Sequence, residues 1–210
     1  MRMKFPHLHL RDLFWLVLVV AVGVSGCTAA SNDAARRSQV EMDSQLNRLK
    51  LGETKLIYLY DTQDTDDLLE KVRGMVEVEE LDLDLTDVSD NGMRHVATLP
   101  KLRRLHIYAG GVSDQGLSLL KSNQSITSLE LSNTLVTDDG LRGLTELPNL
   151  QSLTICFELR IGPRLSDAGI SHLKYLRNLE TLVIGGDWAS DHAINELRSE
   201  MPNCKITRQP

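Results

Sequence analysis

The chain repeats one motif five times at a nearly fixed spacing, and this period limits the folds that it can adopt. The motif is L-x-x-L-x-L, with other aliphatic residues in some leucine positions, and an aspartate follows each copy. A period of this length is typical of stacked units, because one short unit cannot bury its own apolar residues. The sequence therefore predicts a solenoid with an extended surface suited to binding. Spacings of 24, 24, 29 and 24 residues separate Asp90, Asp114, Asp138, Asp167 and Asp191.

Within each unit the hydrophobic period changes from strand-like to helix-like. In the unit at 78–101, Leu81 and Leu83 alternate with acidic residues, which is the pattern of a short half-buried strand. Apolar residues then recur at every third position from Met93, behind a Ser-Asp pair suited to capping a helix. Strands joined through helices must run parallel. The expected fold class is α/β, with parallel strands on the concave face and short helices on the convex face.

The fuller motif L-x-L-x-x-T-x-V-[ST]-D-x-G-L, seen at Leu129–Leu141, resembles the leucine-rich repeat superfamily. Its S/T-D-x-G-L ending is similar to the cysteine-containing, ribonuclease-inhibitor-like branch. The resemblance covers residues 54–207 and implies a solenoid of about six units plus a closing strand at 202–207. Thr62, Thr86 and Thr134 stand where that family usually has Asn or Cys, and Gly110 does so in another unit. We expect each aspartate of the series to cap its own helix, because one carboxylate per unit is sparse for calcium.

Residues 1–27 have the pattern of a targeting segment. Basic residues precede the apolar run Leu13–Val24, whose 12 residues are short for a membrane span and typical of a signal peptide. Small residues directly before Cys27 resemble the bacterial lipobox, which implies cleavage before that cysteine and its lipidation. An uncleaved membrane anchor is the main alternative, and cleavage with release is a third. The first two tether the chain to a membrane, outside the cytoplasm. The segment also resembles the start of many planctomycete envelope proteins, which implies a bacterial cell envelope.

Residues 28–53 form a predicted spacer between this segment and the repeats. Its first residues are small and polar, whereas Ala35–Leu51 can form a helix with Met42, Leu46 and Leu49 on one face. Such a helix serves either as a stalk or as a cover for the first repeat.

Composition and motifs argue against several classes of function. The net charge is −6 with acidic and basic residues mixed, whereas nucleic-acid binding favours a basic face. The sequence has no G-x-G-x-x-G, P-loop, H-E-x-x-H or G-x-S-x-G motif, so we expect no enzyme activity, no cofactor and no metal. Cys156 and Cys204 should lie two strands apart, about 10 Å, which is too far for a disulfide.

Side chains between the core leucines of each strand should face the concave surface. Its N-terminal half combines tyrosines, an acidic row and an Arg/His row, and Tyr and Arg are enriched at binding hot spots. A solvated ladder that stabilises the sheet is the alternative, since Glu80 should lie beside Arg104 and Asp82 beside His106. The candidate partner-binding residues here are Tyr58, Tyr60, Asp82, Asp84, Arg104, His106, Tyr108 and Glu130.

The period breaks once, where five extra residues fall within 158–164. Insertions in repeats map to loops on one rim, often the binding rim, so Arg160, Arg164 and the nearby Trp188 are further candidate contacts. A neutral loop expansion is the alternative. The sequence thus favours a membrane-tethered module that binds a protein or an envelope component, or else a structural envelope scaffold without a dedicated ligand.

Overall fold

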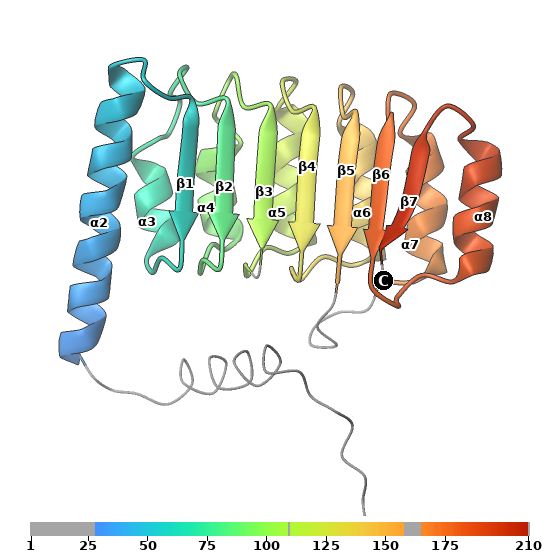
Figure 1. Ribbon diagram of the computed structural model, residues 1–210, viewed down its shortest axis with the longest axis horizontal. Helices are drawn as coiled ribbons and strands as arrows, with labels where there is room; N and C mark the ends of the chain where they lie inside the picture. Colours follow the sequence, from blue (N-terminus) through green and yellow to red (C-terminus); the bar gives the residue numbers. More distant parts are fainter. Residues whose placement is uncertain (1–27, 109, 158–164, 210) are drawn as a thin grey trace, which may run out of the picture. The chain divides into compact units, whose positions relative to one another are not determined.

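A single parallel sheet organises the computed structural model, which describes residues 28–108, 110–157 and 165–209. Seven described strands follow one another in chain order, and a helix follows each of the first six (Figure 1). The strands are β1 (Leu56–Tyr60), β2 (Glu80–Asp84), β3 (Arg104–Tyr108), β4 (Ser128–Ser132), β5 (Ser152–Cys156), β6 (Thr181–Gly185) and β7 (Lys205–Gln209). The helices are α2 (Thr28–Lys50), α3 (Thr65–Glu70), α4 (Asp90–Val96), α5 (Asp114–Leu119), α6 (Asp138–Gly143), α7 (Asp167–His172) and α8 (Asp191–Glu200). Residues 35–210 form one compact unit, to which the description below is confined.

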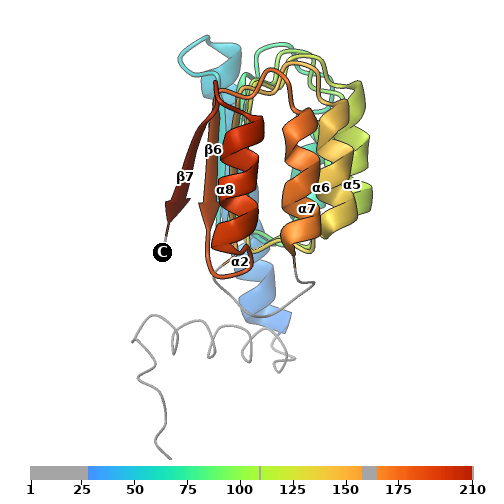
Figure 2. The ribbon, with the colours of Figure 1, turned by 90° about the vertical axis from the view of Figure 1, so that its right-hand side faces the viewer.

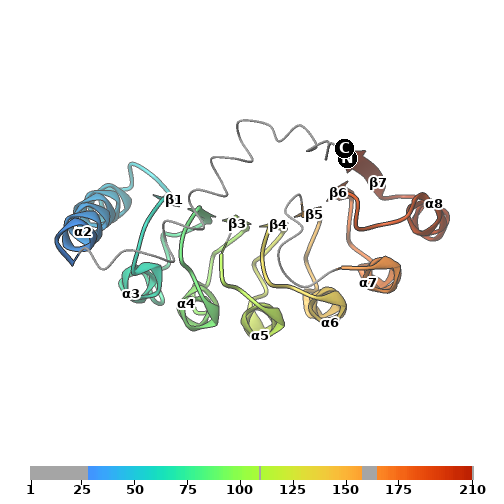
Figure 3. The same cartoon turned by 90° about the horizontal axis from the view of Figure 1, so that it is seen from below.

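The strands pair in register, so equivalent residues of successive repeats form columns. Leu81 pairs with Leu105, which in turn pairs with Leu129, and all three are at most 2% exposed. Leucine over leucine gives one continuous core between the sheet and the helices, as repeat stacking requires. The helices α3–α8 lie on one side of the sheet and on the outer side of its curve (Figures 2 and 3). Residues between the core positions face the other, concave side, as the alternation predicts.

The aspartates near the helix starts form a column, which we call the aspartate column, and they join neighbouring repeats. The expectation that each aspartate caps its own helix is wrong. The serine before it takes that role, because Ser113 Oγ accepts the N–H of Gln115 at 3.2 Å. Asp90, at the start of the preceding helix, accepts the backbone N–H of Ser113 at 2.8 Å and its hydroxyl at 2.6 Å. The same pair of bonds joins Asp66 to Ser89, Asp114 to Thr137, Asp138 to Ser166 and Asp167 to Ser190.

A glycine in the following repeat makes room for four of these five carboxylates, whereas the repeat after Asp167 has Ala193 at that position. A Cβ on Gly140 would lie 2.2 Å from Asp114 Oδ1, and one on Gly116 would lie 2.3 Å from Asp90 Oδ1. Atoms do not approach so closely, so a larger residue at Gly116 or Gly140 would force the aspartate to shift. The S/T-D-x-G signature therefore describes a contact between repeats. Its Ser or Thr caps the helix, its Asp accepts hydrogen bonds from the next repeat, and its Gly leaves space for the Asp of the previous repeat.

A side chain from a helix caps each outer edge of the described sheet. At the β1 edge, Gln45 of α2 accepts the N–H of Tyr58 at 2.7 Å and donates to its carbonyl at 2.5 Å, as a neighbouring strand would. The apolar stripe of α2, including Met42 and Leu49, is buried in the core, so this helix covers the first repeat. At the β7 edge, Arg198 of α8 donates to the Ile206 carbonyl at 3.3 Å. Blocked edges protect a sheet against pairing with other chains.

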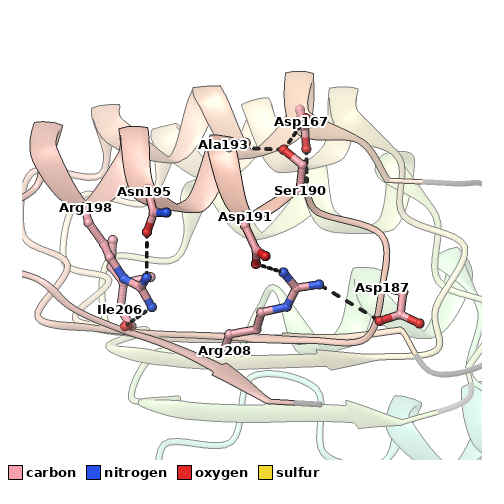
Figure 4. A network of polar contacts seen from close by, with 9 residues as sticks. All are labelled: Asp167, Asp187, Ser190, Asp191, Ala193, Asn195, Arg198, Ile206 and Arg208. Carbon is pink, nitrogen blue, oxygen red and sulfur yellow. Dashed lines mark hydrogen bonds and ion pairs between the residues drawn. The ribbon is translucent and has the colours of Figure 1, made fainter.

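The closing strand lies later than predicted. It spans Lys205–Gln209 instead of 202–207, because Pro202 and the residues after it form the turn that follows α8. Arg208 of this strand ion-pairs with Asp191, the last of the aspartate column, and its guanidinium also lies 4.0 Å from Asp187 (Figure 4). The last repeat is thus tied to β7 through a cation.

Two buried hydroxyls in the turns after the strands lack partners. Thr86 and Thr134 are 4% and 1% exposed, and neither Oγ1 makes a hydrogen bond. By contrast, the Thr62 hydroxyl lies 3.1 Å from that of Thr65 and bonds to it. These are the positions where the sequence departs from the Asn or Cys of the family that it resembles. Among the described helices, none combines the length and apolar character needed to cross a membrane.

Candidate functional site

The register gathers the predicted concave residues into one surface over strands β1–β4. One row runs through Tyr58, Asp82, His106 and Glu130, each paired with the next. The adjacent row runs Tyr60, Asp84, Tyr108. We call this surface the N-terminal concave patch, which comprises Tyr58, Tyr60, Glu80, Asp82, Asp84, Arg104, His106, Tyr108 and Glu130.

Exposed aromatic rings form the β1 side of the patch. Tyr58 and Tyr60 are 41% and 53% exposed, and their rings stack with centroids 6.2 Å apart. Leu56, on the same strand face, is 39% exposed; the alternation of β1 marks it as concave, although it was not among the candidate residues. Partial burial, followed by the nearby carboxylates of Asp84 and Asp82, raises the pKa of the Tyr58 hydroxyl. The core uses the opposite face of the strand, so these rings are not needed to fill it.

Most charged residues of the patch are paired across strands. Arg104 forms an ion pair with Glu80, as the predicted register requires. His106 Nδ1 lies 2.9 Å from Asp82 Oδ1, and its Nε2 lies 3.7 Å from Glu130 Oε1. The hydrogen bond to Asp82 is the main cause that raises the pKa of His106; partial burial opposes it, and the neighbouring carboxylates reinforce it. These contacts are the cross-strand ladder that the sequence offered as an alternative.

Asp84 is the exception in this acidic row. Its carboxylate makes no hydrogen bond or ion pair with any residue in the described ranges. The strand register sets it between Tyr60 on β1 and Tyr108 on β3. Partial burial raises its pKa above the ordinary aspartate value, and Asp82 adds to this effect, whereas His106 opposes it. A half-buried carboxylate between two phenol rings is thus left with unused acceptor capacity.

The remaining candidates do not extend the patch. Arg160, Arg164 and Cys27 lie outside the described residues. Trp188 is half-buried in the loop after β6, where its indole N–H donates to the Gly185 carbonyl at 2.8 Å. Its ring meets Phe157 edge to face, with centroids 6.5 Å apart. Trp188 therefore packs against its own loop and does not join the tyrosines.

A polar groove lies beside the patch, where strands β2–β6 begin. Its volume is about 450 Å³, and Glu79, Arg103, Thr127, Gln151 and Glu180 are among its lining residues. Small-molecule sites are usually lined by apolar and aromatic side chains, which this groove lacks. Within the described ranges, no three His, Cys, Asp or Glu side chains gather closely enough to hold a metal ion.

The repeat unit decides the fold. Each unit places L-x-x-L-x-L on a strand and S/T-D-x-G at a helix start, and six described strand pairs carry this arrangement along one parallel sheet. The chain is a leucine-rich repeat solenoid. The buried columns of core residues and the aspartate contacts hold each repeat against the next one.

Comparison with known proteins adds likenesses of fold only. No known family profile and no curated protein matches the chain. Actin-binding site 2 of leiomodin-1 aligns at 18% identity and a TM-score of 0.44, over 77% of this chain and 86% of that one. A leucine-rich repeat protein of Leptospira interrogans aligns at 17% identity and a TM-score of 0.38, over 62% of this chain and 37% of that one. An internalin of Listeria monocytogenes aligns at 16% identity and a TM-score of 0.35, over 76% of this chain and 62% of that one. This chain thus spans less than two thirds of the two bacterial proteins.

Proposed function

We propose that this leucine-rich repeat solenoid is a non-enzymatic binding module that contacts a protein partner through the N-terminal concave patch. The stacked, exposed pair Tyr58 and Tyr60 carries the proposal. Large aromatic side chains give much contact area when a partner covers them, and tyrosine is enriched among the residues that dominate binding energy.

The cross-strand ladder accounts for part of the patch but not for its tyrosines. Exposed ion pairs such as Glu80–Arg104 contribute about 0–1 kcal/mol, which is enough to explain a charged strand surface. Neither Tyr58 nor Tyr60 takes part in such a pair, and a threonine would suit an exposed strand position equally well. A structural scaffold without a dedicated ligand would leave both rings dispensable.

We also propose that the module is tethered to a membrane outside the cytoplasm, in a bacterial envelope. The support is the N-terminal sequence pattern: basic residues, the apolar run Leu13–Val24, and small residues before Cys27. Mass spectrometry of the protein from the membrane fraction tests this, because a lipidated Cys27 at the new N-terminus identifies a lipoprotein. An intact Met1 points to the uncleaved anchor, and recovery only as a soluble, trimmed chain would rule out tethering.

A position-specific crosslink tests the binding function. A photoreactive phenylalanine analogue at Tyr60 should give a protein adduct of defined mass in the source cells. The same analogue at Tyr175, which is 56% exposed on the 3₁₀ turn after α7, is the matched control and should not give this adduct. Equal adducts from both positions, or none from Tyr60, would exclude a specific site on the concave patch.

A further inference from the structure

We propose that the partner presents a lysine or arginine side chain to Asp84, between the rings of Tyr60 and Tyr108. This inference rests on the proposed function, since it names the chemistry that the N-terminal concave patch selects. The bound group is the cationic side chain of a protein segment, and it contacts a carboxylate that no cation of the described chain contacts directly.

The pairing of charges across the patch singles out Asp84. Glu80 pairs with Arg104, while Asp82 and Glu130 both face His106. No hydrogen-bond donor or cation of the described chain contacts the Asp84 carboxylate, and the charge of His106 acts on it only from a distance. Even with His106 protonated, the patch carries four carboxylates against the two cations Arg104 and His106, so its potential is negative and complements a cationic partner.

The neighbours of Asp84 favour a cation over other groups. The register places Tyr60 and Tyr108 on the two strands that flank it, each about 4.8 Å away in the pairing direction. A lysine or arginine head group within about 6 Å of a tyrosine ring is attracted to its face. The same head group would form a charge-assisted hydrogen bond to the carboxylate, which is stronger than a neutral one. The carboxylate of Asp84 and the two tyrosine rings would therefore bind the same cationic group.

Other occupants fit these residues less well. An apolar partner segment would remove water from Asp84 without replacing its hydrogen bonds, which is costly. Anionic segments would meet the same negative potential that attracts a cation. A metal ion would have one available carboxylate, because the other acidic side chains of the patch are already engaged.

The four tyrosines of the chain provide the readout, since three lie in the patch and Tyr175 does not. The full chain, labelled with ¹³C-tyrosine and held in a non-ionic detergent, is titrated with capped tetra-arginine or tetra-glutamate. Tetra-arginine should shift the ring signals of Tyr58, Tyr60 and Tyr108 and leave Tyr175 in place. Tetra-glutamate should shift none of them. Shifts of all four rings, or of none, would overturn the proposal.

Matched variants separate a specific site from general attraction between charges. Asp84→Asn should weaken tetra-arginine binding at least about tenfold, whereas Glu180→Gln, which removes the same charge from an exposed position, should change it less than about twofold. Equal losses in the two variants would reduce the effect to net charge and overturn the proposal. If Asp84→Asn alters the ring spectrum before titration, Tyr60→Leu serves instead and should weaken binding about threefold.

The crosslink from position 60 distinguishes this inference from the proposed function. If Asp84→Asn lowers the yield of the partner adduct as strongly as Tyr58→Thr does, both stand. If Tyr58→Thr lowers the yield and Asp84→Asn does not, the binding site stands and the cationic contact is wrong. If neither variant lowers the yield, both proposals fail. An adduct of twice the chain mass would identify a second copy as the occupant and overturn the choice of partner made here.

Discussion

Replacing Gly140 with alanine should unfold the solenoid more readily, although alanine normally favours a helix. The new Cβ would lie 2.2 Å from Asp114 Oδ1, so the carboxylate must leave its two bonds to the Thr137 N–H and hydroxyl, at 2.8 and 2.5 Å. Hydrogen bonds to a charged group contribute about 1.5–3 kcal/mol each, against about 1 kcal/mol gained in helix propensity. We expect Gly140→Ala to lower the free energy of unfolding by about 2–5 kcal/mol.

The same helix offers a control for this change. Gly143 is also helical and has nothing within 4 Å of its added Cβ, so Gly143→Ala should raise the free energy of unfolding by up to about 1 kcal/mol. Urea unfolding followed by circular dichroism at the helix band measures both variants. In an Asp114→Ala background, Gly140→Ala should lower the free energy of unfolding by a smaller amount, because the oxygen that it would displace is absent. A Gly140→Ala variant as stable as Gly143→Ala would refute the role assigned to the aspartate column.

Three further predictions concern the sheet edge, the patch and the turns. Gln45→Ala should lower the free energy of unfolding by about 1–3 kcal/mol and speed amide exchange in β1, because the edge strand loses two hydrogen bonds. In an NMR titration, His106 should protonate with a pKa above 6.5, and Asp82→Asn should move it back down. Since its folded pKa is raised, the stabilisation from this pair is complete below pH 6.5 and is lost as the pH rises through the folded pKa. Replacing the buried Thr86 or Thr134 by valine should raise stability in urea by about 1 kcal/mol, because their hydroxyls have no partner.

Each of these three has a clear contrary result. Unchanged exchange in the edge strand of the Gln45→Ala chain would show that α2 does not hold that edge. A His106 titration at or below the ordinary value would show that Asp82 is not its partner. A valine that destabilises the turn by more than about 1 kcal/mol would show that the threonine hydroxyl is satisfied after all.

The period alone was enough to predict the sheet, because in a solenoid the contacts of a residue fall on its counterpart in the next repeat. Glu80 and Arg104 are 24 positions apart, so their pairing could be read from the spacing. The acidic row with its flanking tyrosines followed from the same alignment. What the alignment could not show was which of these charges would remain unpaired, since that depends on side-chain reach across the strands.

The aspartate contacts and the edge caps were beyond the periodic pattern for different reasons. Ser113 and Asp114 both suit a helix cap by residue type, and only the backbone direction shows that the serine caps while the aspartate reaches the next repeat. Gln45 lies outside the repeats, so no counterpart marked it. Trp188 was compatible with either an exposed or a packed position, and its hydrogen bond to Gly185 is set by the loop geometry after β6.

Affinity of the isolated partner for the patch is the most direct test of the central claim, that the exposed tyrosines of β1 bind a protein. Once the position-60 adduct identifies the partner, calorimetry should show Tyr58→Thr/Tyr60→Thr weakening its Kd by at least roughly 30-fold, the equivalent of one hot-spot side chain at about 2 kcal/mol. Tyr175→Thr, which removes an equally exposed tyrosine from the helix side, should leave Kd within about twofold. Equal Kd values for the wild type and the double variant would contradict the account.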